Sequence, residues 1–256
     1  MLRMDEIKSL LVLWQSKTNL LYYHVGTLFF YGEVYTFQYT HHQDAHRNVG
    51  EARRNGYRLH PAFPELEIEY TSTNLFSAFD RRIPSSDRVD FKEIIKNLGL
   101  SEQADLMDIL RETRGMLAGD NYSFEQPIRL YEDRHLKTGF YINGMRHREL
   151  PSTWPLLIQK DKNLRFIIEE KNHKDPHAIR IENESGLHLG YVPGVYAEAI
   201  KSLIQQNILL RISITDIRPQ SAPQWWVSLS IKADLIDDQI DFVNKTQLNG
   251  LIQNSA

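Results

Sequence analysis

The feature that most limits the fold of this chain is a pair of alternating segments joined by a short turn, within residues 172–193. In AIRIE, residues 178–182, two isoleucines face one side of a strand while Arg180 and Glu182 face the other. The turn NESG, residues 183–186, leads into HLGYVP, which ends at Pro193. The pattern predicts a β-hairpin with one buried face.

Asp175-Pro176, just before this hairpin, has two interpretations. In the first, the Asp175 carboxylate accepts backbone N–H groups and Pro176 fixes its own φ, which makes a turn at the strand entrance. In the second, Asp175 is a binding residue at the exposed end of the hairpin. The chemistry of the residues alone favours the turn and leaves the binding role open.

Length and composition indicate a globular protein without a strong global charge. A chain of 256 residues is long enough for two modest domains. The net charge of -3 gives no overall attraction to nucleic acid or to an anionic membrane, so any such binding must be local. The sequence has no Cys, and its apolar patch at residues 10–14 is too short to span a membrane. We therefore expect a cytoplasmic protein that has no membrane partner.

The first half of the chain has mixed helix and strand patterns. The spacing of Ile7, Leu10, Leu11 and Trp14 predicts a helix over residues 5–14. Aromatic and β-branched residues predict a hairpin from residues 20–31 and 33–39, with Gly32 at its turn. Two amphipathic helices are expected over residues 90–98, closed by Gly99, and over residues 102–114, capped by Ser101. A short helix ending at Gly56 is also expected.

The second half is rich in predicted strands. The strands are expected at residues 164–168, 178–182, 188–192, 208–217 and 226–232, with one main helix over residues 195–206. Short strands with one helix are typical of a small, partly closed barrel. We therefore predict an α+β protein with an N-terminal domain (1–130), a barrel domain (138–233) and a C-terminal tail (234–256). The tail is expected to be a loose helix or frayed.

The hairpin and its entrance resemble the HIRAN domain, a small β-barrel module that is fused to DNA-remodelling ATPases and also occurs as a free-standing bacterial protein. The resemblance extends over about residues 138–233. Gly144-Met145-Arg146-His147 is the nearest match to the family's opening-strand element. The other matching positions are Glu170, Asn172, Asp175, Pro176, Ala178, Ile179, Arg180, Ile181, Gly190, Tyr191, Val192 and Pro193.

This resemblance implies a grip on the 3′ end of single-stranded DNA by Arg146, His147, Asp175 and Tyr191. Arginine pairs with phosphate, the rings offer flat faces for bases, and a carboxylate accepts a hydroxyl hydrogen bond. Two positions that are aromatic in the DNA-end binders are Lys174 and Arg148 here. Lys174 is therefore counted as a phosphate contact, and nucleic-acid binding other than end recognition stays open.

The first half resembles the first subdomain of HipA-type serine/threonine kinase toxins over roughly residues 18–127. The matching blocks are YHVGTL (23–28), YTFQY (35–39), YTSTNLF (70–76) and FDRRIP (79–84). No Gly-rich phosphate loop or kinase acidic set follows them, so no catalysis is expected. The resemblance implies a HipS-like antitoxin that docks on a HipA-like kinase lacking its first subdomain.

Candidate partner-binding residues are the aromatic and basic group Phe76, Phe79, Arg81 and Arg82. For the two phenylalanines, burial in the core and contact with a partner are equally favoured interpretations. The two arginines are expected to be exposed. The alternative function is binding of single-stranded DNA or DNA ends in repair or defence.

Two further groups of residues have a structural and a functional interpretation. The four residues His41, His42, Asp44 and His46 favour a solvated loop over a metal site. No cofactor is expected. The pair Trp225-Trp226 favours one core and one rim residue over a stacking role.

Overall fold

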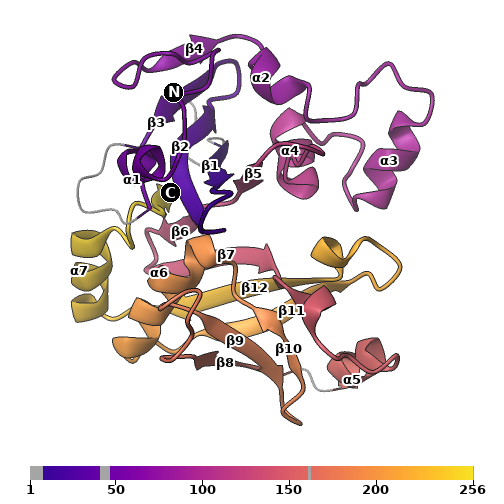
Figure 1. Ribbon diagram of the computed structural model, residues 1–256, viewed down its shortest axis with the longest axis vertical. Coiled ribbons are helices and arrows are strands. Elements are labelled where there is room, and N and C mark those ends of the chain that lie inside the picture. Colours follow the sequence, from indigo (N-terminus) through magenta and orange to yellow (C-terminus); the bar gives the residue numbers. More distant parts are fainter. Residues whose placement is uncertain (1–7, 41–46, 161–162, 256) are drawn as a thin grey trace. The chain divides into compact units, whose positions relative to one another are not determined.

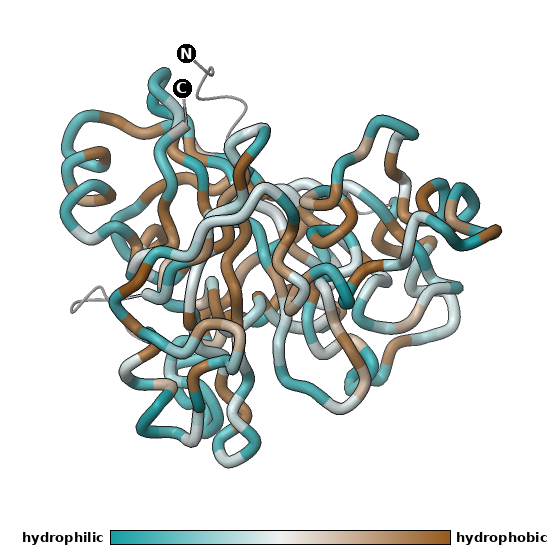
Figure 2. Tube along the Cα trace, turned by 90° about the horizontal axis from the view of Figure 1, so that it is seen from above, coloured by the Kyte–Doolittle hydropathy of each residue, from teal (hydrophilic) through white to brown (hydrophobic). Residues whose placement is uncertain are grey.

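The computed structural model describes residues 8–40, 47–160 and 163–255, which form two units that divide between Pro127 and Ile128 (Figure 1). The first unit has one sheet and the second has two, and each unit has its own helices. Figure 2 shows that hydrophobic and hydrophilic stretches alternate along the chain. Among the described residues, no helix combines the length and the apolar character needed to cross a membrane.

The first unit is built on a five-stranded antiparallel sheet in the order β4-β3-β2-β1-β5. Its aromatic core includes Phe37, Phe63, Phe79 and Phe124, whose rings contact one another. The elements are β1 (Lys8–Gln15), β2 (Tyr22–Phe30), β3 (Tyr35–Tyr39), α1 (Val49–Arg54), β4 (Tyr70–Ser72), α2 (Ser77–Asp80), α3 (Phe91–Asn97), α4 (Leu106–Thr113) and β5 (Tyr122–Glu125).

The predicted helix over residues 5–14 is wrong, because residues 8–15 form strand β1. This strand lies between β2 and β5, and its consecutive residues 9–13 are all buried, so both faces are covered. A continuous apolar run in a central strand also contains the i, i+3, i+4 spacing of a helix. Residues 5–7 lie outside the described part of the chain.

Other predictions for the first unit are confirmed, with shifted boundaries. Strands β2 and β3 form the expected hairpin, and Gly32 adopts a φ of 84° between them. Helix α1 ends before Gly56, as expected. Helices α3 and α4 are both present, but Ser101 is not the cap of α4. Asp105 caps it instead, because its side chain accepts from the Asp108 backbone N–H at 3.0 Å.

The second unit contains two sheets. One has three antiparallel strands in the order β10-β9-β8, and the other has five in the order β11-β12-β7-β6-β13. The elements are β6 (Ile128–Tyr131), β7 (His135–Tyr141), the 3₁₀ helix η2 (Met145–His147), α5 (Trp154–Lys160), β8 (Leu164–Ile168), β9 (Ile179–Asn183), β10 (His188–Tyr191), α6 (Gly194–Gln205), β11 (Arg211–Ile217), the 3₁₀ helix η3 (Pro223–Trp225), β12 (Val227–Asp234), α7 (Asp237–Thr246) and β13 (Ile252–Ser255).

All five strands expected in the second half are confirmed as β8 to β12, and the main helix as α6. The strand pairing of the described residues gives two open sheets and no hydrogen-bonded closure into a barrel. A helix in the tail was one of the two expectations, and residues 237–246 do form α7. The expected frayed end is wrong, because residues 252–255 form β13. Strand β13 pairs in parallel with β6 and so belongs to the sheet.

Candidate nucleic-acid interface

The outer face of the three-stranded sheet carries Tyr191, and the other predicted nucleic-acid-binding residues lie on segments that flank it. Its inner face is apolar, since Ile179, Ile181 and Leu189 are all fully buried. On the outer face, Tyr191 pairs with Arg180, which in turn pairs with Ile167 on β8. The alternation of strand β9 therefore places Arg180 and Glu182 on this face, as the sequence predicts.

A bulge in β10 gathers two rings on this outer face. His188 and Tyr191 are three residues apart, so a regular strand would point them to opposite sides. The register shifts between His188 and Gly190, and both rings then meet edge to face with centroids 5.0 Å apart. Gly190 has a φ of 155°, and a methyl group there would lie 2.4 Å from the Asn143 carbonyl oxygen. Only glycine fits this position.

The close approach at Gly190 brings the segment after β7 against β10. Asn143 and Tyr191 exchange two backbone hydrogen bonds, each 2.9 Å long. Gly144 then turns the chain with a φ of 75° into η2, where Arg146 and His147 are exposed. The Arg146 Nε donates to His147 Nε2 at 2.9 Å. This backbone bridge therefore places Arg146 and His147 close to Tyr191.

Arg148 follows η2 and lies over the ring of Tyr191. Its guanidinium carbon is 5.5 Å from the ring centroid, within the range of a cation–π contact. The Arg148 Nε is buried and has no hydrogen-bond partner among the described residues. In the sequence this residue looked like the loss of an aromatic side chain, whereas the structure makes it a central cation of the site.

Two glutamates offset the charge of Arg180 but leave the rest of the site cationic. The Nη1 of Arg180 lies 3.5 Å from Glu169 Oε1, and its Nε lies 2.9 Å from Glu182 Oε1. Glu169 also accepts from the Tyr191 hydroxyl at 3.3 Å. Burial and the Glu169 charge raise the pKa of Tyr191. Burial and the charges of Arg148 and Arg180 lower the pKa of His188, whose Nε2 lies 3.2 Å from the Gly190 carbonyl oxygen.

The loop that enters β9 is organised by side chains that cap its own backbone. Asn172 Oδ1 accepts from the backbone N–H groups of Lys174 and Asp175 at 3.0 and 3.1 Å. Asp175 Oδ1 accepts from the His177 N–H at 2.9 Å, which is the turn expected from Asp-Pro. The amide of Asn172 donates to Glu169 at 2.9 Å and so ties the loop to the outer face.

The structure thus brings Arg146, His147 and Tyr191 together, and it places Lys174 and Asp175 on the adjoining loop. The side chain of Lys174 is exposed, whereas Asp175 is partly buried. Sequence reasoning missed the roles of Arg148, His188 and Glu169, and it assigned the acidic position at the strand end to the exposed Glu170. Strand alternation from Arg165 and Ile167 would have selected Glu169.

The predicted partner-binding group in the first unit is only partly available. Phe79 is 3% exposed and packs on Phe37 and Phe124, so the core alternative is correct for it. The expected exposure of Arg82 is wrong. This residue is 5% exposed, donates to the Ala78 and Gly115 carbonyls, and pairs with Asp120.

The other two members of that group remain accessible. Arg81 is exposed. Phe76 is partly buried, with its ring edge-on to Phe63. Two of the four predicted contact residues are thus accessible.

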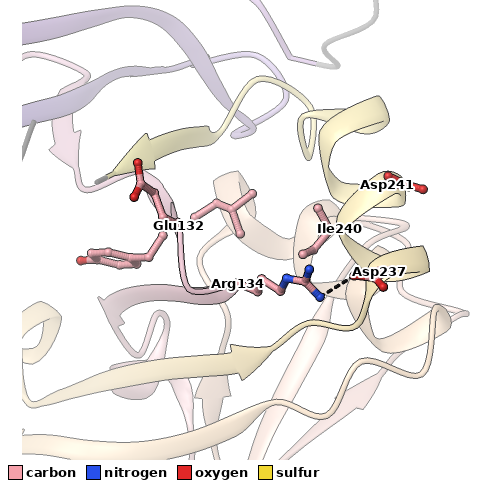
Figure 3. A pocket seen from close by; sticks show the side chains of 7 residues that line it. Glu132, Arg134, Asp237, Ile240 and Asp241 are labelled. Carbon is pink, nitrogen blue, oxygen red and sulfur yellow. Dashed lines mark hydrogen bonds and ion pairs between the residues drawn. The ribbon is translucent and has the colours of Figure 1, made fainter.

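A depression elsewhere in the second unit has the wrong charge for nucleic acid. It encloses about 380 Å³ between the β6–β7 turn and α7 (Figure 3). Glu132, Asp237 and Asp241 line it together with one cation, Arg134, which pairs with Asp237. Its net negative charge repels a phosphate backbone.

The tryptophan pair lies near the candidate interface. Trp226 donates to the Ser221 carbonyl at 2.9 Å and its ring lies 5.5 Å from that of Trp154. Trp225 ends η3, which packs beside η2. In the described part of the chain no group of three or more side chains is suited to hold a metal ion. The four residues weighed as a metal site lie outside that part.

Fold and site together define a two-unit α+β protein whose second unit presents arginines and aromatic rings on one face of a small sheet. Residues 135–235 match the family model of the HIRAN domain, so the second unit contains a HIRAN domain. A similar solved structure is the crystal structure of the HIRAN domain of human HLTF. It has 11% sequence identity and a TM-score of 0.34, with 48% of this chain and 92% of that chain covered. A search of curated proteins finds no match.

Proposed function

We propose that the HIRAN domain of this protein binds single-stranded DNA through η2 and the outer face of β9 and β10, without catalysis. The observation that carries the proposal is the convergence of Arg146, Arg148, His188 and Tyr191 from separate segments. Arginines that are not neutralised attract phosphates, and accessible rings contact bases in a way that tolerates sequence. The resemblance to HIRAN domains that hold DNA ends supports the same ligand.

The test is fluorescence anisotropy of a labelled single-stranded oligonucleotide over a series of salt concentrations. We expect the Arg146→Ala variant to bind more weakly, with the slope of log affinity against log salt reduced by about 0.7 for the lost phosphate contact. Arg134→Ala is the matched control, because it removes an exposed arginine of the same unit at the acidic depression. Equal binding by the unaltered chain and Arg146→Ala would contradict the assignment.

Preference for a DNA end is a separate question for the same assay. An oligonucleotide closed by hairpins at both ends is compared with a linear one of the same length. The Asp175 carboxylate already caps the turn through one oxygen, and Lys174 offers charge in place of a ring. We therefore propose that the domain binds internal segments as well as ends.

Docking on a HipA-like kinase that lacks its first subdomain stays a prediction for the first unit. Of the predicted contact residues, Arg81 and the partly buried Phe76 are accessible in the structure, whereas Phe79 and Arg82 are not. Co-purification after nuclease treatment tests this role, and retention of such a kinase that is lost in Arg81→Glu would support it.

A further inference from the structure

We infer that Arg148 is a phosphate-binding residue of this site and that Tyr191 holds its guanidinium in place. The inference rests on the proposed binding of single-stranded DNA and assigns a contact within it. The guanidinium carbon lies 5.5 Å from the centroid of the Tyr191 ring, so the cation occupies a ring face on which a base would otherwise stack. The rings of His188 and Tyr191 meet edge to face, with their centroids 5.0 Å apart.

Arg148 differs from other partly or fully buried arginines of the chain in its partners. Arg82 pairs with Asp120, Arg114 with Glu125, and Arg180 with Glu169 and Glu182. The Nε atoms of Arg114, Arg148 and Arg180 are alike in being buried without a hydrogen-bond partner among the described residues. What distinguishes Arg148 is that the described residues give it no ion pair. A guanidinium without a carboxylate, held beside an aromatic ring, is suited to bind an anion in a defined direction.

The position of the neighbouring groups points to phosphate as that anion. Exposed Arg146 lies two residues earlier on η2, so a strand crossing this edge meets two cations that no described carboxylate neutralises. The Glu169 carboxylate is engaged by Asn172, Tyr191 and Arg180. A phosphate of the strand supplies the missing oxygen acceptors for Arg148, whether it is internal or terminal.

Substitutions at Arg148 separate a phosphate contact from a stacking contact. We expect Arg148→Ala to weaken binding of a single-stranded oligonucleotide by about 10- to 100-fold and to reduce the salt slope by about 0.7. Arg148→Lys keeps the salt slope but binds more weakly than the unaltered chain, because it lacks the planar fork. Arg148→Phe behaves like Arg148→Ala. Binding by Arg148→Phe at the strength of the unaltered chain would overturn the inference.

Variants at the ring test its positioning role. Tyr191→Phe keeps a ring face for the guanidinium and should retain the affinity, whereas Tyr191→Leu should lose affinity and part of the salt slope together. Loss of affinity in Tyr191→Leu at an unchanged salt slope would mean that the ring stacks on a base, and the inference would fail. Thermal unfolding of each variant confirms that it is folded, and Arg134→Ala again serves as the control for loss of charge.

The outcomes distinguish this inference from the proposed function. If the full chain binds single-stranded DNA but Arg148→Ala binds equally well, only the role of Arg148 is wrong. If the unaltered chain binds no single-stranded DNA, both fail. Oligonucleotides with and without a terminal phosphate then identify the source of the anion, since a higher affinity for the phosphorylated one places a terminal group at Arg148.

Discussion

At the scale of single residues, the most informative titratable group outside the interface is His24. It is buried in β2 of the first unit, with its Nε2 3.1 Å from Thr27 Oγ1. Burial lowers its pKa from 6.5 to about 4. The folded state therefore keeps His24 neutral at a pH where the unfolded chain binds a proton, so stability is lost as the pH falls from 6.5 towards 4.

We predict that His24→Gln reduces this dependence of stability on pH. The free energy of unfolding should fall by up to about 3 kcal/mol more in the unaltered chain than in the variant between neutral pH and pH 4. Urea titrations at several pH values measure it. His147→Gln is the control, because this histidine is exposed on η2. A parallel pH dependence of His24→Gln and the unaltered chain would show that another group is responsible.

At the scale of elements, the bulge in β10 decides whether the interface forms. It turns His188 and Tyr191 to one face, and Gly190 leaves room for the Asn143 backbone. We predict that Gly190→Ala lowers stability and weakens single-stranded DNA binding together, because a methyl group 2.4 Å from the Asn143 carbonyl oxygen pushes the segment before η2 away.

Gly186→Ala is a control for the backbone conformation alone. Gly186 also has a positive φ, of 84°, but a methyl group there meets no atom within 4 Å. The Gly186→Ala substitution should reduce the free energy of unfolding by about 1–2 kcal/mol without affecting DNA binding. Equal effects of the two substitutions on both measurements would rule out the steric role of Gly190.

The same elements show what sequence patterns can predict here. The alternation of residues 178–182 predicts strand β9 and the outer position of Arg180, and the apolar spacing of residues 195–206 predicts α6. The bulge is not visible in such patterns, since His188 and Tyr191 are an odd number of residues apart. The contact of Arg148 with Tyr191 is also invisible in such patterns, for a different reason. It depends on a backbone bridge between segments that are far apart in the sequence.

Strands β1 and β13 are two elements that the sequence patterns did not predict. Residues 10–13 are buried on both faces of a central strand, and such a run has no period that separates it from a helix. Strand β13 is polar, and it becomes a strand by pairing in parallel with β6, which precedes it by more than a hundred residues. Tertiary pairing therefore decides both elements.

At the scale of the whole molecule, the net charge of -3 requires that nucleic-acid binding arise from a local surface. The cationic edge at η2 and the acidic depression beside α7 occur in the same unit. A DNA strand bound at the cationic edge receives no electrostatic attraction from the acidic depression. Binding should therefore be more sensitive to salt than the total charge suggests, since it depends on a few arginines.

Each unit has its own buried core, and this separation leads to a prediction about cooperativity. Leu110 in the first unit and Ile181 in the second are both fully buried. We predict two calorimetric unfolding transitions, of which single-stranded DNA raises only that of the second unit, because a ligand stabilises the folded state it binds. Leu110→Ala should lower the midpoint temperature of the transition that DNA leaves unchanged, and Ile181→Ala that of the transition that DNA raises. Each substitution should reduce the free energy of unfolding of its own unit by about 2–5 kcal/mol. A single transition that moves with DNA and with both substitutions would show that the units unfold as one.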